Sequence, residues 1–211
     1  YDRDGNPRSQ WVKTRTEEQN IEDFVEYVKD LLTDFKGVSR LSDEPSVVMD
    51  ELLTVYPLAD IHHGMLAWGE ESGVDWDINI GQKVIEECVA ELISQSKPSK
   101  HALLLNLGDF FHTNDAKNMT PRSGNILDVD SRYMKMVKTG VLLMITMIEL
   151  ALQKHGTVTV RNLPGNHDQD SCVALTIALS AYYSNNPRVI IDDDPSEFFF
   201  MRFGTTLIGA N

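Results

Sequence analysis

Residues 163–168 read Leu-Pro-Gly-Asn-His-Asp and follow the β-branched run Thr-Val-Thr-Val at residues 157–160. A β-branched run of this kind predicts a strand. Asn166, His167 and Asp168 are therefore expected on the loop just after a strand, which is the edge where open α/β sheets carry out their chemistry. Because Gly, Asn and Asp are also common turn residues, a solvated turn is the alternative interpretation of this stretch.

Two other apolar runs end in the same kind of polar residue. Residues 52–58 lead into residues 60–62 (Asp-Ile-His), and residues 103–107 lead into residues 108–112 (Gly-Asp-Phe-Phe-His). Carboxylate and imidazole groups thus follow each of these runs, as they follow the run at residues 157–160. Three strand ends of this composition favour a shared polar site at the sheet edge over a solvated turn.

The rest of the pattern alternates helices with strands. Helical spacing of apolar residues predicts helices at residues 82–96, 133–154 and 174–183. Strands are expected at residues 52–58, 102–107, 157–160 and 188–192, followed by a hairpin at residues 197–203 and 205–210 that turns near Gly204. The almost wholly apolar run at residues 102–107 is typical of a strand with helices on both faces. This alternation predicts an α/β fold arranged as a layered sandwich.

The N-terminal part of the chain is expected to form an extension at residues 1–49, before a main domain at residues 50–211. An Ile/Phe/Val stripe predicts one amphipathic helix over residues 16–35, with a core-facing or docking role. Residues 38–51 are expected to form an acidic linker. Pro57 lacks the N–H that a central ladder needs, so the first strand is expected to end near Tyr56.

The charge balance narrows the classes of function. With 19 basic and 32 acidic residues, the net charge of -13 argues against a protein that coats nucleic acid through bulk electrostatics. A nucleic acid substrate remains compatible, because a local basic strip or bound divalent cations can neutralise phosphates.

Cysteine usage and hydropathy bear on the compartment. Cys88 and Cys172 have no Cys-x-x-Cys spacing, which disfavours a zinc knuckle or a disulfide framework and favours a reducing compartment. No apolar stretch approaches the roughly 18 residues that span a bilayer, and residues 1–19 are too polar for a secretory signal. We therefore expect a cytoplasmic protein without a membrane partner.

The three polar motifs, in this order and each after a strand, resemble those of the calcineurin-like metallophosphoesterase superfamily. Residues 108–114 are most similar to the SbcD-type exonucleases of DNA double-strand-break repair, some of them phage-encoded, in which a His replaces the Asp of many phosphatases. The resemblance covers roughly residues 52–211. It implies an α/β/β/α sandwich, a phosphodiester substrate such as DNA, and a homodimer or an ATPase partner.

The resemblance also implies a two-metal site. Asp60 and His62 would bind the first ion, Asp109 would bridge both ions, and Asn166 would bind the second ion. Two cations held by hard oxygen and imidazole ligands can clamp the attacking and leaving oxygens of a phosphoryl displacement. Mn²⁺ is the expected ion, with Fe²⁺, Zn²⁺ or Mg²⁺ as alternatives.

Four other residues receive roles in this interpretation. His167 would be the general acid at the leaving group, Asp168 would orient its ring, and His112 would assist at the same phosphate. For His112 the alternative is loop packing, and for Asp168 it is turn formation. Arg122 would contact substrate phosphate, with a solvated surface charge as its alternative.

The remaining histidines and the acidic cluster at residues 192–194 are expected outside the site. His63 would point away from it, whereas His101 and His155 would lie at the surface. The superfamily adds a further His and a Gly-His-x-His motif after the third motif, yet His167 is the last histidine here. We therefore expect an incomplete domain that binds the second ion weakly or not at all and that can lack activity.

Three functions are compatible with these motifs. The first is a DNA exonuclease-like phosphodiesterase. The second is a small-molecule phosphatase or a cyclic-nucleotide phosphodiesterase on the same fold. The third is a metal-binding module without turnover.

Overall fold

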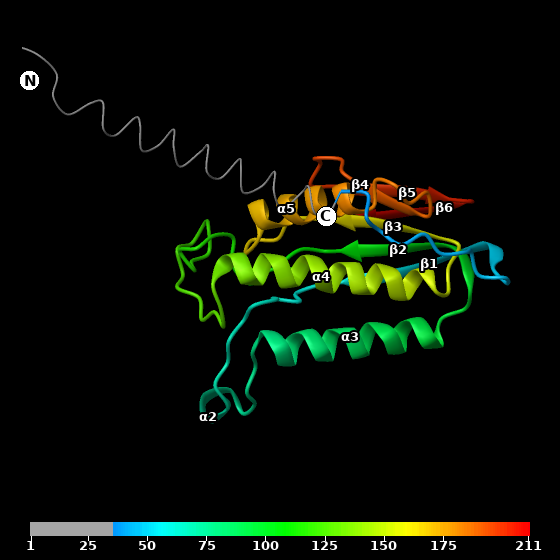
Figure 1. Cartoon of the computed structure of the whole chain (residues 1–211). Helices are drawn as coiled ribbons and strands as arrows, with labels where there is room; N and C mark the ends of the chain where they lie inside the picture. Colours follow the sequence, from blue (N-terminus) through cyan, green and yellow to red (C-terminus); the bar gives the residue numbers. More distant parts are fainter. Residues whose placement is uncertain (1–35) are drawn as a thin grey trace, which may run out of the picture.

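The computed structural model describes residues 36–211 (Figure 1). The helix predicted for residues 16–35 lies outside these residues. The elements follow in the order β1 (Met49–Leu58), α2 (Gly69–Ser72), α3 (Ile78–Gln95), β2 (Ser99–Asn106), α4 (Tyr133–Leu152), β3 (Thr157–Asn162), α5 (Gln169–Tyr182), β4 (Val189–Asp192), β5 (Phe199–Phe203) and β6 (Thr206–Ala210). The predicted α/β class is confirmed.

Residues 36–211 contain two sheets. β1, β2, β3 and β4 form a parallel four-stranded sheet in sequence order, and β5 pairs with β6 in a separate antiparallel hairpin. The hairpin turns at Gly204, as predicted, and the positive φ of 56° there suits a residue without a Cβ. Because all four strands of the larger sheet run the same way, the loops after β1, β2 and β3 meet at one edge.

The two faces of β2 pack against different layers. Ala102 and Leu104 belong to the main core with residues of α3, α4 and α5, whereas Leu103 and Leu105 pack with Phe199 of the hairpin. This separation follows from the alternation of side chains along a strand. Figure 1 shows α3 and α4 on one side of the sheet and the hairpin on the other. The prediction of helices on both faces is therefore wrong for the described residues, since the hairpin covers the second face.

Two helices begin earlier than their apolar periodicity predicts. The Asp77 carboxylate accepts hydrogen bonds from the backbone N–H groups of Asn79 and Ile80, so α3 begins at Ile78 instead of residue 82. α5 begins at Gln169 instead of residue 174. Its first turn is capped from a distant loop by the Asn114 side chain, a contact that periodicity cannot reveal.

The start of the domain also differs from its prediction. β1 continues through Pro57, which lies opposite Leu105, and ends at Leu58, so the predicted end near Tyr56 is wrong. β1 is an edge strand of the four-stranded sheet, where a missing N–H is tolerated. β1 begins inside the predicted linker, and Ser39 donates a hydrogen bond to the Asn185 side chain. Residues 39–51 are therefore tied to the domain.

One predicted surface histidine lies in the interior. His155 is fully buried near the amino ends of β2 and β3, with Nε2 2.7 Å from the Tyr56 hydroxyl and Nδ1 2.8 Å from the Ser99 hydroxyl. Burial lowers the pKa of His155. His101 is half-buried in β2, with Nδ1 2.8 Å from the Thr157 hydroxyl. Among residues 36–211, no helix is long and apolar enough to cross a membrane.

Candidate metal centre

The loops after β1 and β2 lie side by side at the carboxyl edge of the sheet. The backbone N–H of His62 donates to the Asp109 carbonyl at 2.9 Å, and that of His63 donates to the Phe110 carbonyl at 2.7 Å. The N–H of His112 returns a hydrogen bond to the His63 carbonyl at 3.0 Å. The two motif loops thus extend the parallel pairing of their strands, and this pairing brings the first two sets of polar side chains together.

The loop after β3 is attached to the loop after β2 by Asp168. This fully buried carboxylate accepts hydrogen bonds from the backbone N–H groups of Gly165, Phe111 and Asp109, at 2.9, 3.1 and 3.2 Å. Burial raises the pKa of Asp168, and the same three N–H groups act in the opposite direction. Asp168 therefore holds two of the motif loops in register.

The His167 ring is held by a different partner from the predicted one. Its Nδ1 lies 2.8 Å from the backbone carbonyl of His112. A carbonyl only accepts, so Nδ1 carries the proton and donates it. The prediction that Asp168 orients this ring is wrong, because the carboxylate is already used by backbone N–H groups.

The backbone of the site lies in an unusual conformation. Asp60, His62 and Asp109 have φ values of 52°, 46° and 52°. A positive φ is uncommon outside glycine, and such strained residues gather at functional sites. The loops also approach closely, because a Cβ on Gly165 would lie 2.1 Å from the Asp109 carboxylate. The loop after β3 therefore requires glycine at this position.

The predicted ligands of the first ion come together. Asp60, His62 and Asp109 each offer a ligand atom, and these atoms all lie within 4.8 Å of one another. Nε2 of His62 lies 3.9 Å from the Asp60 carboxylate, whose side chain is 74% exposed. One Asp109 carboxylate oxygen accepts the backbone N–H of His167 at 2.8 Å, which fixes the orientation of that side chain. We name these three residues the carboxylate group.

A second set of potential ligands shares His62. Nitrogen atoms of His62, His112 and His167 also lie within 4.8 Å of one another, and we name these residues the imidazole group. Nδ1 of His112 is 3.3 Å from Nδ1 of His62, and the His112 and His167 rings are stacked with centroids 5.4 Å apart. The sequence predicted that His112 and His167 would act near one phosphate but not that they could form a ligand set with His62, because no spacing in the chain encodes this proximity.

Two rings of the imidazole group, those of His62 and His112, favour the neutral form. Burial, reinforced by the neighbouring His62 and His167, lowers the pKa of His112 to about 4. Burial and the nearby His167 also lower the pKa of His62. Because a cation binds neutral imidazole, both rings are in the ligating form at neutral pH.

His63 is separate from both groups, as predicted. Its ring is buried, with Nε2 2.8 Å from the Thr139 hydroxyl on α4, and burial lowers its pKa to about 4. His63 therefore attaches the loop after β1 to the helix layer.

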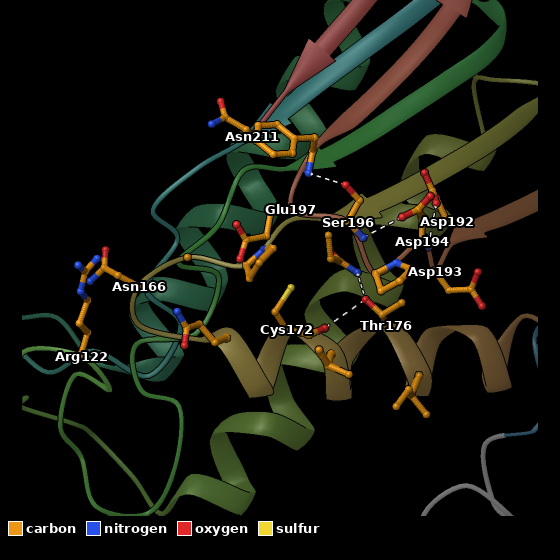
Figure 2. Close-up of a pocket in the computed structure, with 18 residues that line it drawn as sticks. Arg122, Asn166, Cys172, Thr176, Asp192, Asp193, Asp194, Ser196, Glu197 and Asn211 are labelled. Carbon is orange, nitrogen blue, oxygen red and sulfur yellow. Dashed lines mark hydrogen bonds between the residues drawn. The ribbon is translucent and has the colours of Figure 1, made fainter.

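Asn166 and Arg122, the remaining predicted residues, line an adjacent cavity of about 830 Å³. Figure 2 shows them at one end of this cavity and the acidic residues 192–194 at the other. Asn166 is exposed on the loop after β3. Cys172 also lines the cavity, and burial raises the pKa of its thiol to about 12, so the group is protonated at neutral pH.

The acidic wall of the cavity is fixed by an arginine that the sequence did not single out. Arg161, in β3, is 1% exposed and forms an ion pair of 3.2 Å with Asp192. It also donates to the backbone carbonyls of Asp194 and Ser196. The prediction of a solvated acidic cluster is wrong for Asp192, whereas Asp193 and Asp194 are exposed. Arg161 directly follows the β-branched run at residues 157–160, and this strand pattern did not indicate that it would be buried and paired with Asp192.

No family model, curated protein or solved structure matches this chain.

Proposed function

We propose that this chain is a metal-dependent phosphoesterase that hydrolyses phosphodiester bonds, in the manner of the calcineurin-like metallophosphoesterases. The convergence of Asp60, His62 and Asp109 at the carboxyl edge of a parallel sheet supports this proposal. Carboxylate oxygens with one imidazole suit Mn²⁺, and they also suit Fe²⁺ or Zn²⁺. These three residues would hold a divalent cation, which would supply polarisation of a phosphoryl oxygen and activation of water.

A second ion would share Asp109 and take the Asn166 amide oxygen. Asn166 lies on the loop that Asp168 attaches to Asp109, which supports this assignment. In the described residues both groups of three His or Asp ligand atoms include His62, which leaves the second ion with Asp109 and one neutral amide oxygen. We therefore expect the second ion to bind more weakly than the first.

His167 would move the proton in this reaction. Its Nδ1 hydrogen is donated to the His112 carbonyl, so Nε2 is the atom free to hold a proton and release it to the leaving oxygen. His112, stacked on this ring, would face the same phosphate. A proton donor positioned in this way typically contributes about 10²-fold to 10⁴-fold in rate.

The charges around the cavity favour a substrate that enters by one end. Arg122 and Asn166 offer a cation and an amide to phosphate, whereas Asp193 and Asp194 repel a polyanion from the opposite end. The end of a DNA chain can reach Arg122 and Asn166 without passing the two carboxylates. A continuous duplex laid across the cavity cannot avoid them. This contrast supports exonuclease-like action.

A small phosphodiester is the second candidate, because a cavity of about 830 Å³ lies within the range of small-molecule sites. Assays with Mn²⁺ separate these functions. Hydrolysis of bis-p-nitrophenyl phosphate together with shortening of end-labelled single-stranded DNA supports the nuclease. Hydrolysis of cyclic nucleotides or of p-nitrophenyl phosphate alone supports the small-molecule enzyme.

Asp109→Asn provides the decisive variant. The amide oxygen of Asn can still accept the His167 N–H, so the fold should persist while Mn²⁺-dependent hydrolysis falls to background. Asp50→Asn is the control, because Asp50 lies on an exposed strand start and pairs with Lys100. Equal turnover in Asp109→Asn and wild type would refute the proposed function, and Mn²⁺ binding without any turnover in wild type would favour the binding module.

A further inference from the structure

His62 presents one ring nitrogen to Asp60 of the carboxylate group and the other to His112 of the imidazole group. Nε2 lies 3.9 Å from the Asp60 carboxylate, and Nδ1 lies 3.3 Å from Nδ1 of His112. A neutral imidazole has a lone pair on only one nitrogen, because the other nitrogen carries the proton. The ring can therefore ligate a cation on one side or on the other side, but not on both.

The two sides differ in chemistry. The carboxylate group offers two oxygens and one imidazole, a set that accepts hard cations such as Mn²⁺. The imidazole group offers nitrogen alone, and three imidazoles with one open position form a common zinc site. Three neutral imidazoles bring no negative charge to offset desolvation of Mn²⁺ or Mg²⁺. The imidazole group should therefore select zinc.

The surroundings of the imidazole group match those of ligating histidines. A histidine that binds a metal usually donates its other ring N–H to a carbonyl or a carboxylate, which fixes the ring and its tautomer. His167 does so through Nδ1 and the His112 carbonyl, leaving Nε2 with its lone pair. The His112 ring likewise interacts with the backbone of Asp128. Two of the three rings therefore have an outer contact that orients them.

We propose that His62, His112 and His167 form a zinc site whose occupation excludes the hydrolytic cation from the carboxylate group. Zinc would bind His62 through Nδ1 and keep the proton on Nε2, so that Asp60 and Asp109 lose their imidazole partner. Zinc would also occupy His167 and prevent proton transfer. The regulatory consequence rests on the proposed function, whereas zinc binding itself does not.

Metal titrations of the full chain test this site without any measurement of turnover. Co²⁺ replaces zinc as a probe, since its visible absorption distinguishes a tetrahedral nitrogen site from an octahedral oxygen site. Zn²⁺ affinity is measured by calorimetry and Mn²⁺ affinity by electron paramagnetic resonance. Wild type should show a tetrahedral Co²⁺ spectrum and should release Mn²⁺ as one equivalent of Zn²⁺ is added.

Matched variants separate the two sides of His62. His112→Gln and His167→Gln should each lower Zn²⁺ affinity at least about 10-fold and leave Mn²⁺ affinity unchanged. Asp60→Asn should do the reverse, and His62→Gln should weaken both metals. Circular dichroism identifies a variant that fails to fold. If His112→Gln is such a variant, His167→Gln decides the question, because its side chain is only half-buried.

Two results would overturn the proposal. One is unchanged Zn²⁺ affinity in the folded His112→Gln or His167→Gln variant, which would place zinc in the carboxylate group. The other is simultaneous binding of Zn²⁺ and Mn²⁺, which would show that His62 does not force a choice. Neither result depends on hydrolysis, so the proposed function can fail while the zinc site stands.

Discussion

The histidines at the two ends of the parallel sheet have different kinds of hydrogen-bond partner. At the amino end, both nitrogens of His155 have hydroxyl partners, from Tyr56 and Ser99. At the carboxyl end, a nitrogen of His62 faces a nitrogen of His112 at 3.3 Å. A ring with both nitrogens satisfied stabilises the fold, whereas ring nitrogens directed at one another form a site that a cation can complete. The partners of a histidine therefore indicate its role better than its burial does.

The backbone conformation also differs between the two ends of the sheet. His155 closes a short turn between α4 and β3, while Asp60, His62 and Asp109 all adopt positive φ. Strain of this kind persists only where surrounding contacts impose it. At the carboxyl end Asp168 supplies such contacts, so its removal should disturb this end of the sheet and leave the amino end intact.

Asp168→Ala should have the largest effect on stability. Three backbone N–H groups would lose their acceptor in the interior, and each unsatisfied group costs about 1 to 3 kcal/mol. We expect the free energy of unfolding to fall by at least about 3 kcal/mol in urea titrations. Asp193→Ala, an exposed carboxylate, is the control and should match wild type. A loss equal to that of the control would mean that Asp168 does not hold the loops.

His167→Ala should separate chemistry from metal binding. Turnover should drop about 10²-fold, the lower end of the range for general acid catalysis, while Mn²⁺ affinity stays within error. Kinetics on bis-p-nitrophenyl phosphate and Mn²⁺ titration measure the two effects. Loss of Mn²⁺ binding in this variant would instead make His167 a ligand of the hydrolytic cation.

At the amino end of the sheet, His155 should make the free energy of unfolding depend on pH. The pKa of His155 is lowered by folding, so the unfolded chain binds more protons once the pH falls below about 6.5. This residue should therefore contribute a loss of stability with falling pH, of at most about 1.4 kcal/mol per pH unit.

His155→Gln isolates that contribution. The pKa values of His62, His63 and His112 are lowered as well, so wild type retains a slope from several groups. The difference in unfolding free energy between wild type and variant should narrow from pH 7.5 to pH 5.5 in urea titrations. A constant difference would contradict a neutral, buried His155.

Arg122→Ala should have the smallest effect. Its side chain is exposed at the rim of the cavity, where a phosphate contact contributes modestly. KM for DNA should rise a few-fold with kcat unchanged, while Arg202→Ala on the hairpin serves as the control. Equal KM values in the two variants would assign Arg122 to the solvated surface.

Local patterns predicted most of the fold. The polar residues that follow β1, β2 and β3, the hairpin turn at Gly204 and the long helix α4 each follow from periodicity or composition. The earlier start of α5 did not, because its cap comes from Asn114, distant in sequence. The interior position of His155 was missed for the same reason, since Tyr56 and Ser99 reach it from other strands.

The candidate site also has a part that the sequence predicts and a part that it does not. Parallel strand ends were sufficient to predict that Asp60, His62 and Asp109 converge. The partners of His167 and Asp168 could not be predicted, because they depend on how two loops cross beyond the sheet. Ring orientation decides whether His62 serves one ligand group or two, and only three-dimensional geometry specifies it.

The carboxyl end of the sheet should bind a divalent cation, and the amino end should not. Crystals of this chain grown with Mn²⁺ test it directly through anomalous scattering at the manganese edge. We predict a peak bound by Asp60, His62 and Asp109, and none beside His155. A map with no manganese between those three side chains, at a Mn²⁺ concentration that supports hydrolysis, would contradict the account.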